Sequence, residues 1–502
     1  MQLNRMAGGE KSRPFVGRIS ADFGYGFTTL QDPSWSLSQV LLATGGRFVG
    51  GSPEAKFRFI STDSRSIEAG DLFLALSGEQ YDGLTFVQEA ARKGAAGVIV
   101  DRLPEPMPPV VVVLVEDALV ALGDLAAYRR SLMQNLKVMA VTGSSGKTTV
   151  KEMVAAIVSQ KKRVLKTKGN FNNLIGLPLS LLPVGRQDDV AVLEMGMNQA
   201  GEIARLAEIA DPDIACITNV QTAHLAGFGD IEGVARAKGE LFAGVKSWST
   251  LVVNLDDKWI RKLARKCEQK KITFGRARQA DVRATHILDR GGRGVSYTLH
   301  LKGDKCRVHL KAMGTHNVSN SLAAAAMAHV AGIRLAAIVK GLESFQGFDK
   351  RLQVQELANG LQLVNDTYNA NPASMLAALE TVHGASRDHN AVAVLGDMLE
   401  LGQQSRASHA FVGESAGRLG YDYLLAVGEY AEVIVDGARK AGMAGKRARV
   451  FADKAALVEF LRKKMAAGAL GRGDWLLVKG SRGMRMETII SDLEKVVEGE
   501  AV

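Results

Sequence analysis

Apolar and polar positions along the chain alternate in blocks that predict repeated α/β units. Short apolar runs indicate buried strands, and they occur at 71–76, 97–100 and 110–115, at 138–141, 190–195, 214–219 and 251–254, and at 361–366, 391–396, 423–427, 447–451 and 475–479. Helical patterns of about 10 to 15 residues separate the runs in the middle of the chain, which is typical of βαβ units and a parallel sheet. The pattern therefore predicts the α/β class.

The alternation of strands and helices restarts twice, and this predicts three domains. We expect a mixed α/β N-terminal domain at 35–137, a central domain with a mostly parallel sheet at 138–346, and a C-terminal Rossmann-like domain at 347–502. Residues 1–34 show no clear hydrophobic period, so we treat them as an N-terminal extension.

The composition is that of a chain with several hydrophobic cores, which excludes a single small binding module. Of the 502 residues, 46% are hydrophobic and 23% are charged, and Lys plus Arg outnumber Asp plus Glu by 63 to 53. The resulting net charge of +10 favours anionic ligands but does not choose between nucleic acid, nucleotides and acidic metabolites. The basic cluster at 161–168 lacks interleaved aromatic residues, so we expect no nucleic-acid partner.

Membrane and export signals are missing from the sequence pattern. No apolar run approaches about 18 residues, and the basic N-terminus is not followed by an apolar segment, so we expect neither a membrane span nor a secretory signal. Cys216, Cys267 and Cys306 are far apart and odd in number, which favours a reducing compartment and gives no zinc-site spacing. We therefore expect a cytoplasmic protein.

The strongest chemical signal is the segment 141–149, Val-Thr-Gly-Ser-Ser-Gly-Lys-Thr-Thr, between an apolar strand and an amphipathic helix. It predicts a phosphate-binding loop: glycines let backbone N–H groups surround phosphates, Lys147 reaches the β- and γ-phosphates, and the Thr148 hydroxyl ligates Mg²⁺. The strict pattern G-x-x-x-x-G-K-[ST] fails at Val141, but the flanking strand and helix favour a phosphate loop over a chance turn. The expected nucleotide contacts are Gly143, Ser144, Ser145, Gly146, Lys147, Thr148 and Thr149.

Two further candidate residues follow strands of the predicted central sheet. Glu194 ends the strand at 190–195, and His224 comes shortly after the strand at 214–219. Ligands of open parallel sheets bind beyond the carboxyl ends of the strands, where a carboxylate suits Mg²⁺ and a neutral imidazole can join a second metal. Each residue alone fits an ordinary strand end or loop, whereas their convergence on one phosphate loop favours a metal site.

Lys238 lies on the apolar stripe of a predicted helix at 231–242. Apolar residues recur at i, i+3, i+4, i+10 and i+11, and Lys238 takes position i+7. A buried ammonium is costly, so the side chain either extends to solvent, or loses its charge through a lowered pKa or covalent modification. As a carbamate, Lys238 would be an anion able to ligate metal beside Glu194 and His224.

The chain resembles the Mur ligases through motifs that run in order from about residue 35 to the end. These motifs are the phosphate loop, Asn170–Pro178, Glu194–Gly196, Gly201–Ile203, Thr218–Asn219 with His224, Ala237–Glu240, Gly314–Asn320, Asp366–Pro372, Leu395–Gly402 and Val478–Arg482. The resemblance implies an N-terminal domain for a UDP sugar, a central P-loop ATPase, and a Rossmann-like domain that closes over the nucleotide.

The resemblance also assigns residues outside the phosphate loop. Ser64 and Arg65 would hold the UDP end of the substrate, and the loop with Asn172 and Asn173 would face its muramoyl peptide. The remaining contacts, to adenine, phosphate and ribose at the domain seam, would come from Asn317, Arg351 and Asp366. Catalysis would rest on Lys147, Glu194, His224 and Lys238. The metal ligands would be Thr148, Glu194, His224 and Lys238.

Within the family, the segments 368–372 and 396–402 indicate that D-alanyl-D-alanine is joined to UDP-N-acetylmuramoyl-tripeptide in peptidoglycan precursor synthesis. The resemblance implies ATP and Mg²⁺ as cofactors, an acyl phosphate intermediate without a covalent protein nucleophile, and a monomer. The alternatives are a ligase that adds meso-diaminopimelate, lysine or glutamate, and a P-loop switch or nucleic-acid ATPase, which the basic charge permits. The third residue of the tripeptide, diaminopimelate or lysine, stays open.

Overall fold

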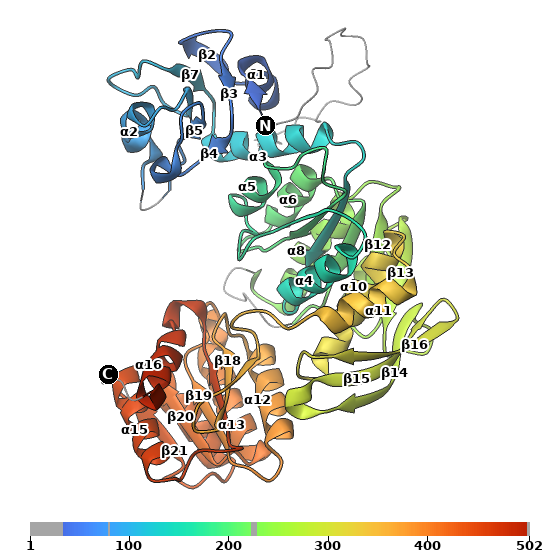
Figure 1. Cartoon of the computed structure of the whole chain (residues 1–502), viewed down its shortest axis with the longest axis vertical. Coiled ribbons are helices and arrows are strands. Elements are labelled where there is room, and N and C mark those ends of the chain that lie inside the picture. The colour runs from blue at the N-terminus through green and yellow to red at the C-terminus, as the bar shows by residue number, and fades with distance from the viewer. Residues whose placement is uncertain (1–33, 79–80, 222–227, 499–502) are drawn as a thin grey trace, which may run out of the picture.

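A computed structural model describes residues 34–78, 81–221 and 228–498, and it arranges them as three successive α/β domains (Figure 1). The strands that the apolar runs predict are present, and β6 and β20 have the predicted bounds. The fold class predicted from the sequence is therefore confirmed. No helix in these ranges is long and apolar enough to cross a bilayer.

The N-terminal domain is built on a mixed sheet with the order β2-β7-β6-β5-β4, in which only the β2–β7 pair is antiparallel among the described strands. Its elements are β1 (Trp35–Ser36), α1 (Leu37–Thr44), β2 (Arg47–Gly50), β3 (Lys56–Phe57), β4 (Ile60–Ser61), β5 (Leu72–Leu74), α2 (Val87–Arg92), β6 (Gly97–Val100), β7 (Val111–Leu114) and α3 (Ala118–Ser131). Helix α3 lies against the central domain, where Arg129 donates from Nε to the Val184 carbonyl oxygen at 2.9 Å.

The central domain has a sheet whose described strands run in the order β16-β15-β14-β13-β12-β11-β8-β10-β9. The parallel part comprises β8 (Lys137–Thr142), β9 (Val164–Lys166), β10 (Val190–Glu194), β11 (Ile214–Ile217), β12 (Thr250–Asn254), β13 (Lys270–Gly275) and β14 (Val282–Asp289), and β15 (Val295–Leu301) and β16 (Asp304–Leu310) continue it antiparallel. The helices are α4 (Lys147–Val158), α5 (Gly176–Leu181), α6 (Glu202–Ala210), α8 (Ile231–Gly244), α9 (Lys258–Ala264), α10 (His316–Val330) and α11 (Leu335–Ser344). The apolar runs did not predict this antiparallel extension.

The C-terminal domain has the order β17-β18-β22-β19-β20-β21, and β17 alone among the described strands of this sheet pairs antiparallel. The strands are β17 (Gln353–Glu356), β18 (Gln362–Asp366), β19 (Ala391–Leu395), β20 (Tyr423–Val427), β21 (Ala448–Phe451) and β22 (Trp475–Lys479). The helices are α12 (Pro372–Ser386), α13 (Ser405–Leu419), α14 (Ala431–Lys440), α15 (Lys454–Ala466) and α16 (Glu487–Glu498), with the 3-10 turn η5 (Arg482–Met484) before α16.

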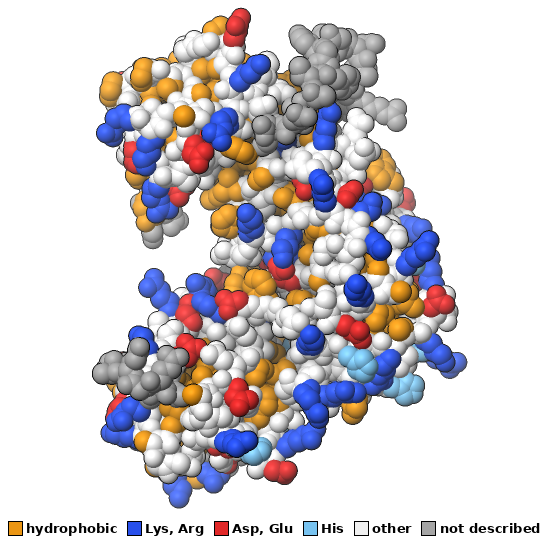
Figure 2. All heavy atoms as spheres, in the orientation of Figure 1, with side chains coloured by type: hydrophobic (Ala, Val, Ile, Leu, Met, Phe, Trp, Pro, Cys, Tyr) orange, Lys and Arg blue, Asp and Glu red, His pale blue; other side chains and the backbone are white. Residues whose placement is uncertain are grey.

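The two domain junctions differ in how apolar they are. One continuous core cluster joins the N-terminal and central domains, since it contains both Leu122 of α3 and Leu206 of α6. By contrast, Met313 is the one buried central-domain residue in the core clusters described for the C-terminal domain. The C-terminal domain therefore packs around its own cores and meets the central domain mainly through polar groups. A wide opening separates its surface from the N-terminal domain (Figure 2).

Candidate active site

A polar cavity between the central and C-terminal domains brings most of the predicted site residues together. Its volume is about 890 Å³. The central domain lines it with residues 144–149, Asn172, Glu194, Lys238 and Asn317, and the C-terminal domain lines it with Lys350, Arg351, Asp366, Lys479 and Arg482. Cationic side chains from both domains thus surround one space that also contains carboxylates.

The phosphate loop forms the turn between β8 and α4, as its sequence predicts. Gly143 and Gly146 have φ angles of 152° and 78°. A Cβ would lie 1.9 Å from the Thr218 hydroxyl oxygen at the first position and 2.3 Å from Oδ1 of Asn320 at the second. Only glycine fits at both positions. The unpaired N–H groups of the first turn of α4 belong to residues that line the cavity, which makes the turn suitable for an anion.

The end of β11 braces the phosphate loop through Asn219. Its Oδ1 accepts from the Ser145 backbone N–H at 3.0 Å, and its Nδ2 donates to the Ser145 carbonyl oxygen at 3.0 Å. The Thr218 hydroxyl donates to the same carbonyl oxygen at 2.6 Å. These contacts fix the loop backbone before any ligand binds.

Lys147 begins α4 and folds back over the loop. Its Nζ donates to the Gly143 carbonyl oxygen at 2.8 Å. Burial lowers the pKa of Lys147, the carboxylate of Glu194 raises it, and the guanidinium of Arg351 lowers it again, so the net direction is down. The ammonium is thus held at the loop within the electrostatic influence of both Glu194 and Arg351.

The Thr148 hydroxyl lies between the two domains. Its Oγ1 donates to Oε2 of Glu194 at 2.8 Å and accepts from Nη2 of Arg351 at 2.9 Å. Glu194 is 2% exposed, and its Oε1 accepts from Nδ2 of Asn172 at 2.8 Å. Oxygen atoms of Thr148 and Glu194 that could bind a metal therefore lie together at the carboxyl end of β10, the edge of the sheet that the sequence pattern predicts.

A second lysine, Lys151, lies behind Glu194. Its side chain is fully buried, donates to the Thr167 carbonyl oxygen at 2.8 Å, and has Nζ 3.1 Å from Oε1 of Glu152. The same Nζ is 4.0 Å from Oε2 of Glu194. Lys151 therefore balances part of the negative charge at Glu194.

Lys238 is buried on the apolar stripe of α8. Asp230 caps this helix by accepting from the Gly233 N–H at 2.7 Å, and Lys238 two turns later is 2% exposed. Burial lowers the pKa of Lys238 well below its usual value, and the nearby Lys147 ammonium lowers it further. The side chain does not extend to solvent, which removes one of the sequence alternatives.

The C-terminal wall of the cavity is built around Arg351 and Asp366. The Arg351 guanidinium carbon lies 4.1 Å from the ring centroid of Tyr368, and its Nε is buried without a hydrogen-bond partner in the described part of the chain. Asp366 accepts from Nζ of Lys479 at 2.7 Å and, through Oδ1, from the Leu352 backbone N–H at 3.2 Å. An unused cationic donor in a polar cavity is suited to an anionic ligand.

Several predicted residues lie in different surroundings. Asn317 lines the cavity, but its amide bonds to Met313 and Asn320 at 2.7 and 2.8 Å. Asn173, unlike Asn172, caps α5 by accepting from the Gly176 N–H at 2.8 Å.

The remaining predicted residues are Ser64, Arg65 and His224. Ser64 and Arg65 lie on the N-terminal domain and are not among the residues that line the cavity, and Arg65 pairs with Asp63 at 2.8 Å. This pairing lowers the pKa of Asp63 to about 2, since hydrogen bonds from Arg65 outweigh the effect of burial. His224 falls in 222–227, outside the described residues.

Sequence reasoning did not assign a role to Lys479 or to Lys350. Lys479 ends β22 and pairs in register with Asp366 at the end of β18. The strand-end rule used on the central sheet would have found both residues if it had been applied to the C-terminal sheet. Lys350 offered no comparable signal beyond its position next to Arg351.

Comparison with protein-family models finds three matches in chain order. The model described as "Mur ligase family, catalytic domain" matches residues 56–130, "Mur ligase middle domain" matches 141–328, and "Mur ligase, glutamate ligase domain" matches 350–482. Residues 329–349 separate the last two matches, and Lys350 and Arg351 lie in the linker between α11 and β17, residues 345–352.

Relatives and solved structures agree with these matches. The UDP-N-acetylmuramoyl-tripeptide--D-alanyl-D-alanine ligase of Escherichia coli K12 is 38% identical over 465 residues, which cover 92% of this chain and 99% of that protein. A crystal structure of MurF from Acinetobacter baumannii superposes with a TM-score of 0.84 at 36% identity, covering 92% of this chain and 99% of the other. MurF from Thermotoga maritima in complex with ADP has a TM-score of 0.77 at 29% identity, covering 88% and 98%.

Proposed function

The chain belongs to the Mur ligase family, and from this premise we propose that it joins D-alanyl-D-alanine to UDP-N-acetylmuramoyl-tripeptide at the expense of ATP. The reaction serves peptidoglycan precursor synthesis. The observation that carries the proposal is the Thr148 hydroxyl, which joins Glu194 of the central domain to Arg351 of the C-terminal domain across the cavity. A ligase of this kind needs anion-binding groups from two domains around one phosphoryl group.

ATP binds with its phosphates in the loop at 143–149, because free N–H groups, the dipole of α4 and Lys147 meet there. The unpaired Nε of Arg351 supplies a donor from the opposite wall. Asn317 and Asp366 contact the adenine and the ribose. The Thermotoga maritima relative, whose structure contains ADP, supports a nucleotide in this cavity.

Mg²⁺ is the metal that the oxygen donors at Thr148 and Glu194 fit. In the described part of the chain, no three side chains of His, Cys, Asp or Glu converge as a wholly protein-built site would require. Mg²⁺ nevertheless commonly takes only one or two carboxylates and completes its shell with phosphates and water. When bound, the ion would neutralise charge on the β- and γ-phosphates. A second Mg²⁺ would be held by Glu194, His224 and Lys238.

The reaction has two steps, and charge control dominates the first. The tripeptide carboxylate attacks the γ-phosphorus, the bond to the ADP oxygen breaks, and an acyl phosphate forms. Two anions must approach each other, and Lys147 and Arg351 reduce their repulsion. The amine of D-alanyl-D-alanine then attacks the acyl carbon, loses a proton, and the tetrahedral intermediate expels phosphate. Asn172, beside Glu194, faces the peptide.

Lys238 acts as a carbamate. Burial of the side chain and the neighbouring Lys147 ammonium both disfavour a second positive charge at this position. The nitrogen of a neutral amine can attack the carbon of CO₂, and loss of one N–H proton to solvent leaves a carbamate, whose negative charge would favour a cation beside Glu194. The pKa of Lys238, lowered well below its usual value, supports the neutral amine that this addition needs.

The N-terminal domain binds the UDP end of the substrate through Ser64 and Arg65, and Asn173 contributes to the peptide loop. The domains divide at 35–137, 138–346 and 347–502, a division supported by the sheets and by the family matches. The enzyme is a cytoplasmic monomer, and its three free cysteines accord with a reducing compartment.

Mass spectrometry of the reaction products tests this function. The purified protein is incubated with ATP, Mg²⁺ and UDP-N-acetylmuramoyl-tripeptide carrying either diaminopimelate or lysine, and with D-alanyl-D-alanine or single amino acids. We expect a pentapeptide product only when D-alanyl-D-alanine is supplied. A product from UDP-N-acetylmuramoyl-dipeptide with diaminopimelate or lysine would instead identify a sibling activity and overturn the proposal.

A further inference from the structure

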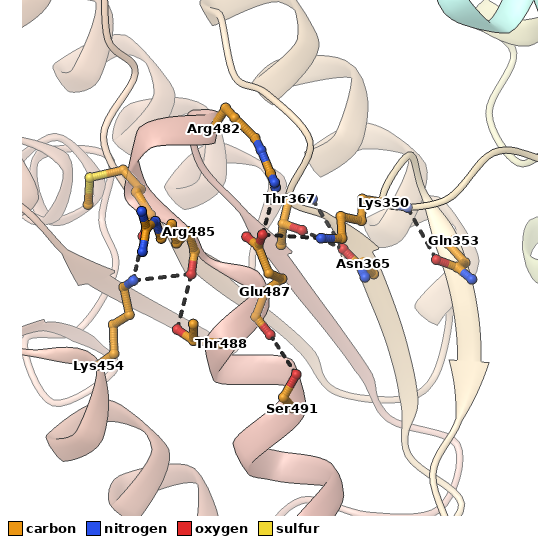
Figure 3. Close-up of polar contacts among 11 residues, drawn as sticks. Lys350, Gln353, Asn365, Thr367, Lys454, Arg482, Arg485, Glu487, Thr488 and Ser491 are labelled. Atoms are coloured by element: carbon orange, nitrogen blue, oxygen red, sulfur yellow. Dashed lines mark hydrogen bonds and ion pairs between the residues drawn. The ribbon is translucent and has the colours of Figure 1, made fainter. Parts of the chain in front are cut away.

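Two cations of the cavity wall meet at one carboxylate oxygen, Oε1 of Glu487. Figure 3 shows Glu487 at the start of α16, with Lys350 reaching it from the linker and Arg482 from η5. The Lys350 Nζ donates to Oε1 at 3.1 Å, and the Arg482 Nη1 donates to the same atom at 2.6 Å. Without this carboxylate, two positive side chains at such close quarters would repel each other.

Lys350 and Arg482 both line the nucleotide cavity, whereas Glu487 does not. Lys350 also precedes Arg351, the residue that reaches Thr148 in the phosphate loop at 2.9 Å. Glu487 is therefore connected to the phosphate loop through two adjacent residues of the linker, Lys350 and Arg351. Glu487 can therefore influence the reacting groups through Lys350 and Arg351 without contacting them.

The linker backbone around Arg351 is held in an unfavourable conformation. Lys350 and Leu352 have φ angles of 58° and 46°, in the left-handed region that residues other than glycine avoid. Hydrogen bonds fix both residues: the Lys350 carbonyl oxygen accepts from the Tyr368 N–H at 3.1 Å, and the Leu352 N–H donates to Asp366 at 3.2 Å. Because this backbone is strained, the orientation of Arg351 depends on the contacts that hold its neighbours.

The Glu487 carboxylate is suited to hold cations. Its side chain is 22% exposed, against 26% for Lys350 and 58% for Arg482. Burial raises the pKa of Glu487, but its own backbone N–H and the Lys350 ammonium outweigh this effect, so the carboxyl stays ionised. Its Oε2 is buried and accepts no hydrogen bond within the described chain. Both cations are therefore held at Oε1.

We infer that Glu487 is a positioning residue for nucleotide binding, which holds Lys350 and Arg482 together at the cavity wall and thereby fixes the linker that carries Arg351. The ligand is the triphosphate of a nucleotide, because Lys350, Arg351 and Arg482 present three positive charges at the cavity wall. Glu487 holds Lys350 and Arg482 in place. This inference rests on the proposed function, since it assigns a role to Glu487 in the same ATP site.

The test compares Glu487→Gln with Glu494→Gln. Glu494 lies seven residues later, two turns along the same helix face, and its Oε1 accepts from Nε2 of Gln355 on β17 at 2.9 Å, a contact that involves none of the residues 350–352. For Glu487→Gln we expect the KM for ATP to rise about tenfold, the loss typical of one hydrogen bond to a charged group. We expect the KM for D-alanyl-D-alanine to change less than about twofold, and Glu494→Gln to match the wild type.

Calorimetric titration with ATP separates this inference from the proposed function. Weaker ATP binding by Glu487→Gln, with partial recovery in Glu487→Asp and a similar loss in Lys350→Met, supports the positioning role. Equal ATP affinity in the wild type and Glu487→Gln overturns it, as does an equal loss in both glutamine variants, which would indicate helix stability alone. If the wild type itself binds no ATP, the proposed function fails.

Discussion

Arg351 donates from Nη2 to the hydroxyl oxygen of Thr148 at 2.9 Å, although 203 residues separate them in the chain. The contact joins the C-terminal domain to the phosphate loop of the central domain. Because the two domains share little apolar core, this polar contact and its neighbours determine how they meet. The site is therefore complete only when the C-terminal domain lies against the central one.

Replacing Lys147 with alanine should abolish ligation while leaving the fold intact. Removing one preorganised charge that stabilises a transition state costs about 3 to 4 kcal/mol, or roughly a hundredfold or more in rate. In the described part of the chain, the Lys147 ammonium donates its hydrogen bond to a backbone carbonyl of its own loop, so we expect the unfolding temperature to change by a few degrees at most. Steady-state kinetics and thermal unfolding measure both effects.

Lys161→Ala is the matched control, since Lys161 is exposed in the basic cluster after α4. It should retain wild-type turnover. Wild-type-like activity of a folded Lys147→Ala variant would contradict the assignment of the phosphate loop.

ATP and UDP-N-acetylmuramoyl-tripeptide together should compact the molecule. The C-terminal domain has its own cores and faces the N-terminal domain across an open gap, so it can move as a body (Figure 2). Small-angle X-ray scattering should show a smaller radius of gyration with both ligands than with neither. An unchanged radius at saturating concentrations of both would exclude closure.

Lys238→Ala should lose most activity and recover part of it when a short-chain carboxylate such as acetate is added. The added carboxylate would supply the negative oxygen that the proposed carbamate provides. The same addition should not restore Lys147→Ala, where a positive charge is missing. Full activity of Lys238→Ala, or a bare ammonium at this residue in a high-resolution crystal structure with both metals bound, would show that no carbamate is required.

His409 should make stability depend on pH. Its Nε2 accepts from the Met398 N–H at 2.8 Å, and its Nδ1 contacts the Ser405 carbonyl oxygen at 2.6 Å, so the folded protein holds the neutral ring. Burial lowers the pKa of His409 despite opposing contributions from Ser405 and Asp397. In the unfolded chain the histidine pKa is about 6.5, so below this pH the unfolded state binds the proton first and the folded state loses stability.

Thermal unfolding between pH 7 and pH 5 measures this effect. The unfolding temperature of the wild type should fall as the pH falls, and His409→Gln should show a shallower dependence. Exchange of the exposed His389 for glutamine provides the control and should leave the wild-type slope. An identical slope in His409→Gln would mean that His409 contributes nothing to it.

Buried parallel strands were the part of the fold most accessible from sequence. They appear as continuous apolar runs, such as Gly97–Val100, because both faces of the sheet are covered. Strands β14, β15 and β16 were missed because polar residues interrupt their apolar positions, as at His286, His300 and His309, and leave no continuous apolar run. Their pairing depends on contacts with the rest of the sheet.

The candidate site likewise contains some residues that the sequence locates and others that only the folded chain reveals. Strand ends and the glycine loop locate Glu194 and Lys147, because parallel topology brings these positions to one edge. Asn172 and Asn173 are indistinguishable in sequence, yet one bonds to Glu194 and the other caps a helix. Glu487 is 137 residues from Lys350 and carries no motif, so only the folded chain reveals their pairing.

Release of inorganic phosphate from ATP, measured with each substrate omitted in turn, shows whether ATP consumption is coupled to ligation. If the chain is the proposed ligase, phosphate appears at the full rate only when UDP-N-acetylmuramoyl-tripeptide and D-alanyl-D-alanine are both present, and in step with the pentapeptide product. A P-loop switch or nucleic-acid ATPase would instead hydrolyse ATP without either substrate, faster when duplex DNA is added. Release that is independent of the two substrates would contradict the account.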